Sequence, residues 1–213
     1  MCFDAKSSME AFIISSLGTS MLYFSGDKTK QKISYFWLSV TLIQLWEYFI
    51  WKNIDNKEKN RFWTAILRIN ISLQPLIALL VLISLPNYLP KELLLGILMV
   101  VIIVVVNWIY NIFNKPIETT KVNSNNNLKW KGSFTDKTQE IIPTMVYFLA
   151  LTILPWFIKP FKTGITFGML IIFSILLTFL KSENYDIINN SGWKSLWCYS
   201  ASLIPILQYV LTN

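Results

Sequence analysis

Long apolar stretches alternate with short polar connectors along the whole chain. Seven stretches can be drawn, and several approach or exceed the roughly 20 residues that a helix needs to cross a bilayer. They cover roughly 7–25, 33–52, 62–85, 91–113, 139–158, 163–181 and 193–211. A longer Asn-, Lys- and Thr-rich loop at 114–138 lies between the fourth and fifth. The pattern predicts one all-α domain, an integral membrane bundle of seven transmembrane helices, with a solvated and mobile long loop.

Composition supports this prediction and excludes several kinds of chemistry. Of the 213 residues, 54% are hydrophobic and 15% are charged, whereas soluble domains average about 25% charged residues. The absence of histidine excludes haem ligation by His, His-based zinc sites and catalytic pairs of Ser or Cys with His. Two cysteines allow at most one disulfide within the chain. We expect no cofactor and no metal.

The net charge of +7 would suggest nucleic acid in a soluble protein, but the distribution of the charges favours another explanation. With seven spans, the N-terminus and the loops after spans two, four and six share one side. Of the 19 Lys and Arg residues, six lie on the other side: Lys28, Lys30, Lys32, Lys91, Lys159 and Lys162. The positive-inside rule then predicts a cytoplasmic N-terminus and a C-terminus on the opposite side. The expected partner is membrane lipid, with no nucleic acid.

The first ten residues, MCFDAKSSME, do not resemble a secretory leader. Glu10 lies inside the stretch that forms the first helix, and no clear cleavage pattern follows it. We therefore expect this segment to be retained as the cytoplasmic end of span one.

Polar residues inside the predicted spans are the candidates for function. They are Glu10, Gln44, Glu47, Arg68, Asn70, Gln74, Asn107, Asn111, Glu140 and Cys198. All except Gln74 are expected within about three turns of the cytoplasmic face. A charged side chain at membrane depth costs about 2.5–3.5 kcal/mol or more unless it faces a partner, the bundle interior or water. These residues either fix helix packing or line a water-filled cavity, and for the group a cavity is favoured.

The leading hypothesis is a transporter or channel for an ion or small solute. Glu47 is the deepest acid, with Arg68 and Glu10 as its expected charge partners. An acid beside an arginine can bind a cation or exchange a proton when its partners rearrange. The cavity lining would come from polar side chains on three spans: Gln44, Asn70, Gln74 and Asn107.

Two alternatives remain. Cys2 and Cys198 are expected on the same side, and they are included among the candidate ligand-binding residues. An intramembrane enzyme acting on a lipid-like substrate would use one of these thiols as nucleophile, with Glu10 or Glu47 as base. A receptor or scaffold would instead depend on the 114–138 loop. The oligomeric state is left open.

A retinal pigment is excluded because the only lysine of span seven, Lys194, lies at its edge.

Short motifs at both ends of the chain suggest a family. Met1-Cys2-Phe3-Asp4-Ala5 resembles the start of an uncharacterised family of bacterial membrane proteins that begin Met-Cys-Phe-Ser-Ala, with Asp4 in place of the serine. Gln44 and Glu47, before Phe49 and Trp51, resemble that family's second span, and 195–198 (SLWC) resembles a Ser-x-Trp-Cys motif of its last span. Related proteins occur in large DNA viruses of eukaryotes, which implies a host-cell or virion membrane. The resemblance implies no activity.

Overall fold

The computed structural model describes residues 4–114, 117, 119–122, 128–129, 137–181 and 201–212, with the backbone alone at 129, 137–144 and 177–181. This part is mostly helical, which confirms the all-α prediction. In chain order the elements are α1 (Ala5–Tyr23), α2 (Lys28–Lys52), α3 (Lys57–Ser84), α4 (Lys91–Asn114), β1 (Lys121–Val122), β2 (Leu128–Lys129), α5 (Lys137–Thr152), the 3₁₀-helix η1 (Leu154–Phe157), α6 (Phe161–Lys181) and α8 (Ile204–Thr212).

The helices begin where capping residues allow rather than where apolarity begins. Asp27 accepts hydrogen bonds from the backbone N–H groups of Thr29 and Lys30, so α2 starts at Lys28 and not at the predicted 33. Asn56 caps the N–H of Lys59, so α3 likewise starts before the predicted 62. Both first turns are polar, which explains why an apolar pattern missed them.

The first helix is closed by a capping box at its N-terminus. The Asp4 carboxylate accepts from the backbone N–H of Ser7 at 2.7 Å, while the Asp4 N–H donates to the Ser7 hydroxyl. The donated backbone hydrogen bond lowers the pKa of Asp4 below its usual value, and the Ser7 hydroxyl adds to this effect. Asp4 is thus a helix cap at the position where the resembled family has serine, another favoured cap.

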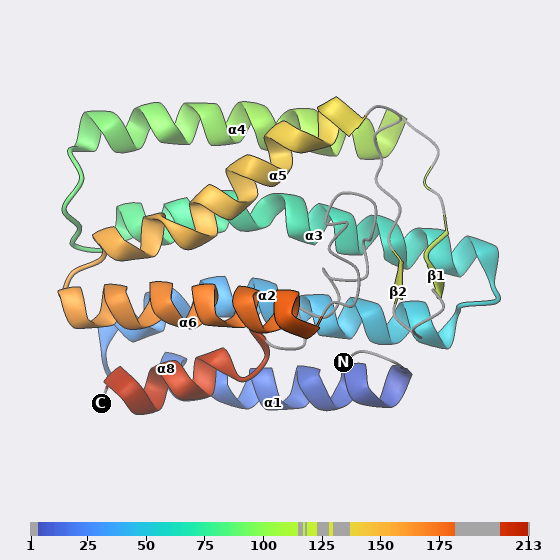
Figure 1. The fold of residues 1–213 in the computed structure, drawn as a ribbon, viewed down its shortest axis with the longest axis horizontal. Helices are drawn as coiled ribbons and strands as arrows, with labels where there is room; N and C mark the ends of the chain where they lie inside the picture. The colour runs from blue at the N-terminus through green and yellow to red at the C-terminus, as the bar shows by residue number, and fades with distance from the viewer. Residues whose placement is uncertain are drawn as a thin grey trace.

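Consecutive helices run in alternating directions and pack as neighbours (Figure 1). The first packs against α2 and α8, α2 packs against α3, and α3 packs against α4 and α5. The starts of α1 and α3 and the ends of α2 and α4 therefore gather at one end of the bundle, beside β1 and β2. Helix α4 lies at the edge of the bundle.

The core is continuous and partly aromatic. The rings of Phe36 and Trp37 on α2 meet Phe167 of α6, with centroids 5.2–5.5 Å apart and edge-to-face geometry. All three side chains are almost fully buried. The fifth predicted stretch, 139–158, ends too late, because α5 stops at Thr152 and the 3₁₀-helix η1 follows it. The end of η1 and the segment after it are held against the α3–α4 turn by two backbone hydrogen bonds. Tyr88 N–H donates to Phe157 O, and Lys159 N–H donates to Pro86 O.

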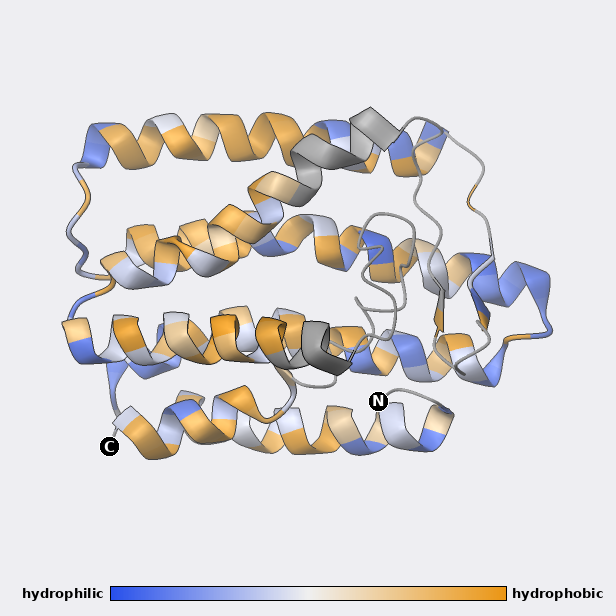
Figure 2. Ribbon diagram, in the orientation of Figure 1, coloured by the Kyte–Doolittle hydropathy of each residue, from blue (hydrophilic) through white to orange (hydrophobic). Residues whose placement is uncertain are grey.

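The outer surface of the bundle is apolar. Figure 2 shows hydrophobic residues over most of α1, α4, α6 and α8, and hydrophilic residues at the turn between α2 and α3. Large apolar side chains are exposed on each of the described α-helices, for example Leu17, Ile103 and Phe173. Within the described residues, α3 and α4 are long and apolar enough to cross a membrane. The structure thus supports two membrane-capable helices, fewer than the seven spans predicted.

Part of the 114–138 loop is folded, contrary to the prediction of a solvated, mobile segment. β1 and β2 pair in antiparallel register, Lys121 with Lys129 and Val122 with Leu128. Leu128 is fully buried and Thr120 is 2% exposed. The prediction is wrong at these positions because backbone and side-chain hydrogen bonds to α3 hold the segment, which a polar composition does not reveal.

Candidate functional site

One face of α2 carries polar side chains from one end of the helix to the other, and they are buried in the bundle. Successive members are three or four residues apart, the spacing of neighbours on a helix surface. They are Lys30, Ser34, Trp37, Thr41, Gln44 and Glu47. Over its 25 residues α2 is about 38 Å long. A polar stripe therefore runs through most of the length of the bundle.

Gln44 and Glu47 lie at one end of this stripe, and Arg68 lies on the neighbouring helix α3. Their exposed fractions are 1%, 0% and 7%. Contacts of Trp46 with Trp63 and of Ser39 with Asn70 align the two antiparallel helices, so Arg68 lies level with Thr41, about one turn from Gln44. Each of the three side chains interacts with another group of the protein. The structure buries all three residues, and it places Arg68 nearer the middle of the stripe than Glu47.

Asn70 and Gln74 belong to a network that joins α2, α3 and α5. The Gln74 amide nitrogen donates to the backbone carbonyl of Ser39 at 3.2 Å. With the Asn70 amide oriented so that its oxygen and nitrogen both have partners, the Asn70 nitrogen donates to the same carbonyl at 2.9 Å. The Asn70 oxygen accepts from the Trp46 indole N–H at 2.9 Å. The Gln74 oxygen accepts from the Tyr147 hydroxyl at 2.6 Å. Both amides are therefore committed to helix–helix hydrogen bonds and position the helices around the stripe.

Hydroxyl groups connect the middle of the stripe to α1. The Thr41 hydroxyl lies 2.6 Å from that of Ser15 and 3.3 Å from that of Thr19, and all three residues are buried. Hydroxyls both donate and accept, so such a cluster can pass a proton or coordinate a small cation as well as join helices.

The opposite end of the stripe contains Lys30 and the α8 residue Gln208. The Lys30 ammonium lies 5.4 Å from the centre of the Tyr209 ring, and Lys30 is only 5% exposed. The Gln208 oxygen accepts from the Trp37 indole N–H at 2.6 Å. The Gln208 nitrogen is buried and has no hydrogen-bond acceptor within the described part of the chain. This end therefore presents a donor that a polar solute could use.

Glu10 and Asn107 lie outside the buried group. The Glu10 side chain is 56% exposed and pairs with Lys6 at 3.9 Å, one turn away on α1. Asn107 lies on the exposed side of α4, where its carbonyl oxygen and side-chain oxygen accept from Asn111. The expectations that Glu10 is a charge partner of Glu47 and that Asn107 lines the same cavity do not agree with these positions. Each residue's rotation about its helix axis turns it outward.

Three candidates are not placed. Cys2 and Cys198 lie outside the described residues, and so does the side chain of Glu140. The enzyme hypothesis built on the thiols therefore stays a prediction. Within the described residues, no group of three or more Cys, Asp and Glu side chains could hold a metal ion.

Near the α2–α3 turn, side chains of α3 form hydrogen bonds with the folded part of the 114–138 loop. The Asn60 amide donates to the Thr120 carbonyl at 3.1 Å and its oxygen accepts from the Thr120 N–H at 2.9 Å. The hydroxyls of Thr64 and Thr120 lie 2.9 Å apart. These contacts place β1 over the same end of the bundle as Glu47.

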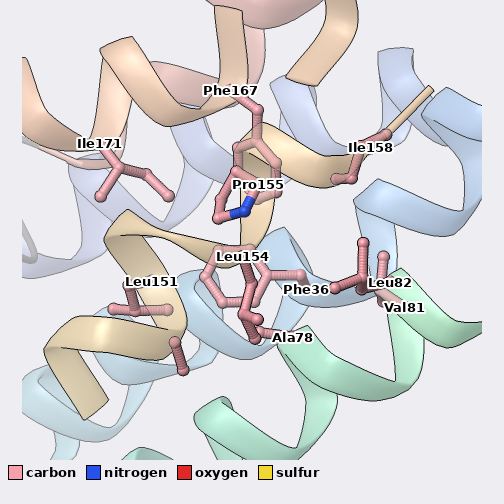
Figure 3. Close-up of a pocket in the computed structure, with 11 residues that line it drawn as sticks. Phe36, Ala78, Val81, Leu82, Leu151, Leu154, Pro155, Ile158, Phe167 and Ile171 are labelled. Carbon is pink, nitrogen blue, oxygen red and sulfur yellow. The ribbon is translucent and has the colours of Figure 1, made fainter. Parts of the chain in front are cut away.

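A small cavity of about 10 Å³ lies between α2, α3, η1 and α6 (Figure 3). Its lining is entirely apolar and includes Phe36, Leu154, Pro155 and Phe167. A space of this size without polar partners does not favour bound water. The cavity is therefore a packing defect in the core and not part of the polar stripe.

Comparison of the chain with protein families, with characterised proteins and with solved structures gives no match in any of the three. The resemblance of the N-terminal motif to the Met-Cys-Phe-Ser-Ala family stays a hypothesis.

Reasoning from the sequence found Gln44 and Glu47 but missed the rest of the stripe and the hydroxyl groups of other helices that meet it or its neighbours. Ser15, Thr19 and Thr41 are ordinary residues of apolar helices, because their hydroxyls can bond to the backbone of their own helix. Tyr147 is also an ordinary residue of such a helix. The signal that could have found Thr41 is its place in the three- and four-residue spacing that links Lys30 to Gln44.

Proposed function

We propose that this chain is an integral membrane protein of seven transmembrane helices with its N-terminus in the cytoplasm. The apolar exterior of the described α-helices supports this placement, because soluble proteins rarely expose contiguous apolar patches of more than a few hundred Å². The alternating helix directions also support it, since they bring the polar turns to the two ends of the bundle.

In this proposal the protein moves a proton or small cation along the polar face of α2. One observation carries the proposal: Glu47 is fully buried at one end of a polar stripe that extends to Lys30 at the other. Burying a carboxylate in a membrane bundle is costly, and such residues usually mark ion pathways or proton relays. Thr41 and its two α1 hydroxyl partners supply polar groups at the middle of the same path.

The roles of the residues follow from their positions. Glu47 would take up the cation or proton at the cytoplasmic end, and Arg68, on the neighbouring helix, would set how readily Glu47 becomes neutral. Gln44 would provide an amide beside Glu47. Asn70 and Gln74 would hold the helices in place through the Ser39 carbonyl and would not contact the ion.

The test is ion flux in proteoliposomes. Purified protein is reconstituted, and entry of protons, Na⁺ and K⁺ is followed with fluorescent indicators under a clamped membrane potential. We expect flux above that of empty vesicles and a reduction of about tenfold or more in Glu47→Gln. Glu58→Gln is the matched control, because Glu58 is an exposed acid in the first turn of α3. Equal flux in both variants, or wild-type flux no greater than that of empty vesicles, would overturn the proposal.

A second function, a membrane scaffold whose partner binds the α4–α5 loop, is favoured by the fixed position of Thr120 on α3. Replacing 117–129 with a Gly-Ser linker distinguishes the two. A scaffold predicts that a co-purifying partner is lost from the linker variant and kept by Glu47→Gln. A transporter predicts that flux survives the linker and is lost in Glu47→Gln.

A further inference from the structure

The outward side of α4 has a regular pattern of its own. Gly96, Val100, Ile103, Asn107, Tyr110 and Asn114 follow one another in steps of four and three residues and are all exposed. Val100, Ile103 and Tyr110 are 56%, 64% and 63% exposed. Steps that alternate between four and three form the a/d seam of a left-handed coiled coil. We call these six residues the α4 seam.

No other described helix packs against the α4 seam. Helix α4 turns a different set of side chains toward the bundle, including Leu94, Val101, Val105 and Ile112, which are at most 4% exposed. Two faces of one helix thus have the spacing of an interface, and only one has a partner within the described residues.

Asn107 indicates what covers the α4 seam. It is seven residues from the end of α4 at Asn114, about 10 Å along the axis. The 24-residue helix is about 36 Å long, which exceeds a hydrocarbon layer of about 30 Å by only a few ångströms at each end. If α4 spans the membrane as proposed above, the Asn107 amide lies within the lipid layer, where the acyl chains offer it no hydrogen bond.

The Asn107 amide has donors to spare. Its oxygen accepts from Asn111 at 3.3 Å, and its nitrogen donates no hydrogen bond within the described part of the chain. An exposed amide at this depth favours a neighbour that both donates and accepts hydrogen bonds, and helix-to-helix amide bonds are a recurrent means of association in membranes.

A second copy of this chain meets these requirements. Two copies inserted in the same direction present parallel α4 helices, so a two-fold axis along the membrane normal brings each seam residue against its own counterpart. The two Asn107 amides then each donate to and accept from the other. A single Asn at an a position also fixes register and favours two strands.

Gly96 permits the close approach that such a pair needs. No atom lies within 4 Å of the position that a side-chain carbon would take at Gly96, and the residue is exposed. Small residues at membrane interfaces allow two helix backbones to approach each other. Gly96 and Asn107 are eleven residues apart in the seam. Gly96 allows the two helices to approach each other, and the Asn107 amide fixes the register of the pair.

We propose that the protein forms a parallel homodimer through the α4 seam, with the Asn107 amides hydrogen-bonded to each other across the two-fold axis. This inference rests on the membrane placement proposed above and not on ion transport. Extraction of the membranes with alkaline carbonate tests that placement by itself. Release of the protein into the soluble fraction would refute the placement and, with it, the dimer.

Disulfide crosslinking tests the geometry of the dimer. In a background of Cys2→Ser and Cys198→Ser, Ile103→Cys is placed in the seam. Leu95→Cys is placed on another exposed side of α4, where Leu95 is 58% exposed. With copper phenanthroline in proteoliposomes at low protein density, we expect at least fivefold more covalent dimer from Ile103→Cys. Equal yields, or no dimer from either variant, would overturn the proposal.

Fluorescence energy transfer between labelled copies, measured while the protein is diluted with lipid, tests the roles of Asn107 and Gly96 in self-association. Asn107→Leu should weaken self-association about 3- to 30-fold. Gly96→Leu should weaken it as well, although the open space around Gly96 leaves the single copy undisturbed. Leu95→Ala should leave association unchanged. A wild-type protein that is monomeric at every lipid dilution would show that lipid covers the seam and would refute the dimer.

Discussion

The side-chain amide of Asn60 binds both backbone groups of Thr120, 60 residues further along the chain. Its oxygen accepts the Thr120 N–H at 2.9 Å, and its nitrogen donates to the Thr120 carbonyl at 3.1 Å. Both residues are at most 2% exposed. The Asn60 amide thus supplies the donor and the acceptor that a paired residue of a neighbouring strand would supply. These two hydrogen bonds fix the position of the polar loop against the helix.

Replacing Asn60 with Ala should release this loop. The variant leaves the Thr120 N–H and carbonyl without their partner, which costs about 1–3 kcal/mol of local stability. Hydrogen exchange at 119–122 should accelerate, while exchange in α1 should not change. Asn53→Ala serves as control, because the Asn53 amide bonds only within its own helix end, to Phe49. Equal acceleration at 119–122 in both variants would contradict the role of Asn60.

Removing the hydroxyl of Tyr147 should loosen the contact between α3 and α5. In Tyr147→Phe the buried Gln74 oxygen loses the donor that lies 2.6 Å away, and an unsatisfied buried acceptor costs about 1–3 kcal/mol. The midpoint of thermal unfolding in detergent should fall. Tyr88→Phe is the control, because Tyr88 is 55% exposed in the α3–α4 turn. A decrease of the same size in the control would mean that the Gln74 bond contributes nothing specific.

A methyl group at Gly18 should disturb the packing of α1 on α8. A side-chain carbon there would lie 2.7 Å from the backbone nitrogen of Ile206 and 2.9 Å from Cβ of Pro205, closer than van der Waals contact allows. Gly18→Ala should therefore destabilise by about 1–3 kcal/mol. Gly96→Ala, at an open helical position, should be neutral or gain up to about 1 kcal/mol. Chemical denaturation of dilute protein compares the two, and a stable Gly18→Ala would refute the close contact.

The Asp4 cap should make the first turn of α1 sensitive to acid. Because the hydrogen bond from the Ser7 N–H lowers the folded-state pKa of Asp4 below 3.8, the cap stabilises the helix fully above that unfolded value. Its contribution falls as the pH drops through the lower folded value. Hydrogen exchange at 5–8 should be faster in Asp4→Ala than in wild type at neutral pH, and the difference should shrink below about pH 4. A difference that persists at pH 2 would contradict a carboxylate cap.

The positions of the helices could be predicted from the sequence because they depend on local properties. A run of apolar residues places a helix approximately. The caps Asp27 and Asn56, which the apolar pattern missed, start α2 and α3 before the predicted 33 and 62. The burial of Glu47 and Arg68 agrees with the expectation that a charged group in an apolar bundle faces inward, whereas Glu10 does not agree with it.

The polar contacts between helices depended on the tertiary structure. Nothing in the sequence separates Glu10, which is exposed beside Lys6, from Glu47, which is fully buried. Nor does it indicate that Thr41 meets Ser15 or that Tyr147 reaches Gln74. The physical reason is that the exposed and the buried faces of these helices are both apolar, so an apolar helix carries little information about which of its faces turns inward. The rotation of each helix about its axis is decided by packing against its neighbours, and that rotation selects the polar groups that meet.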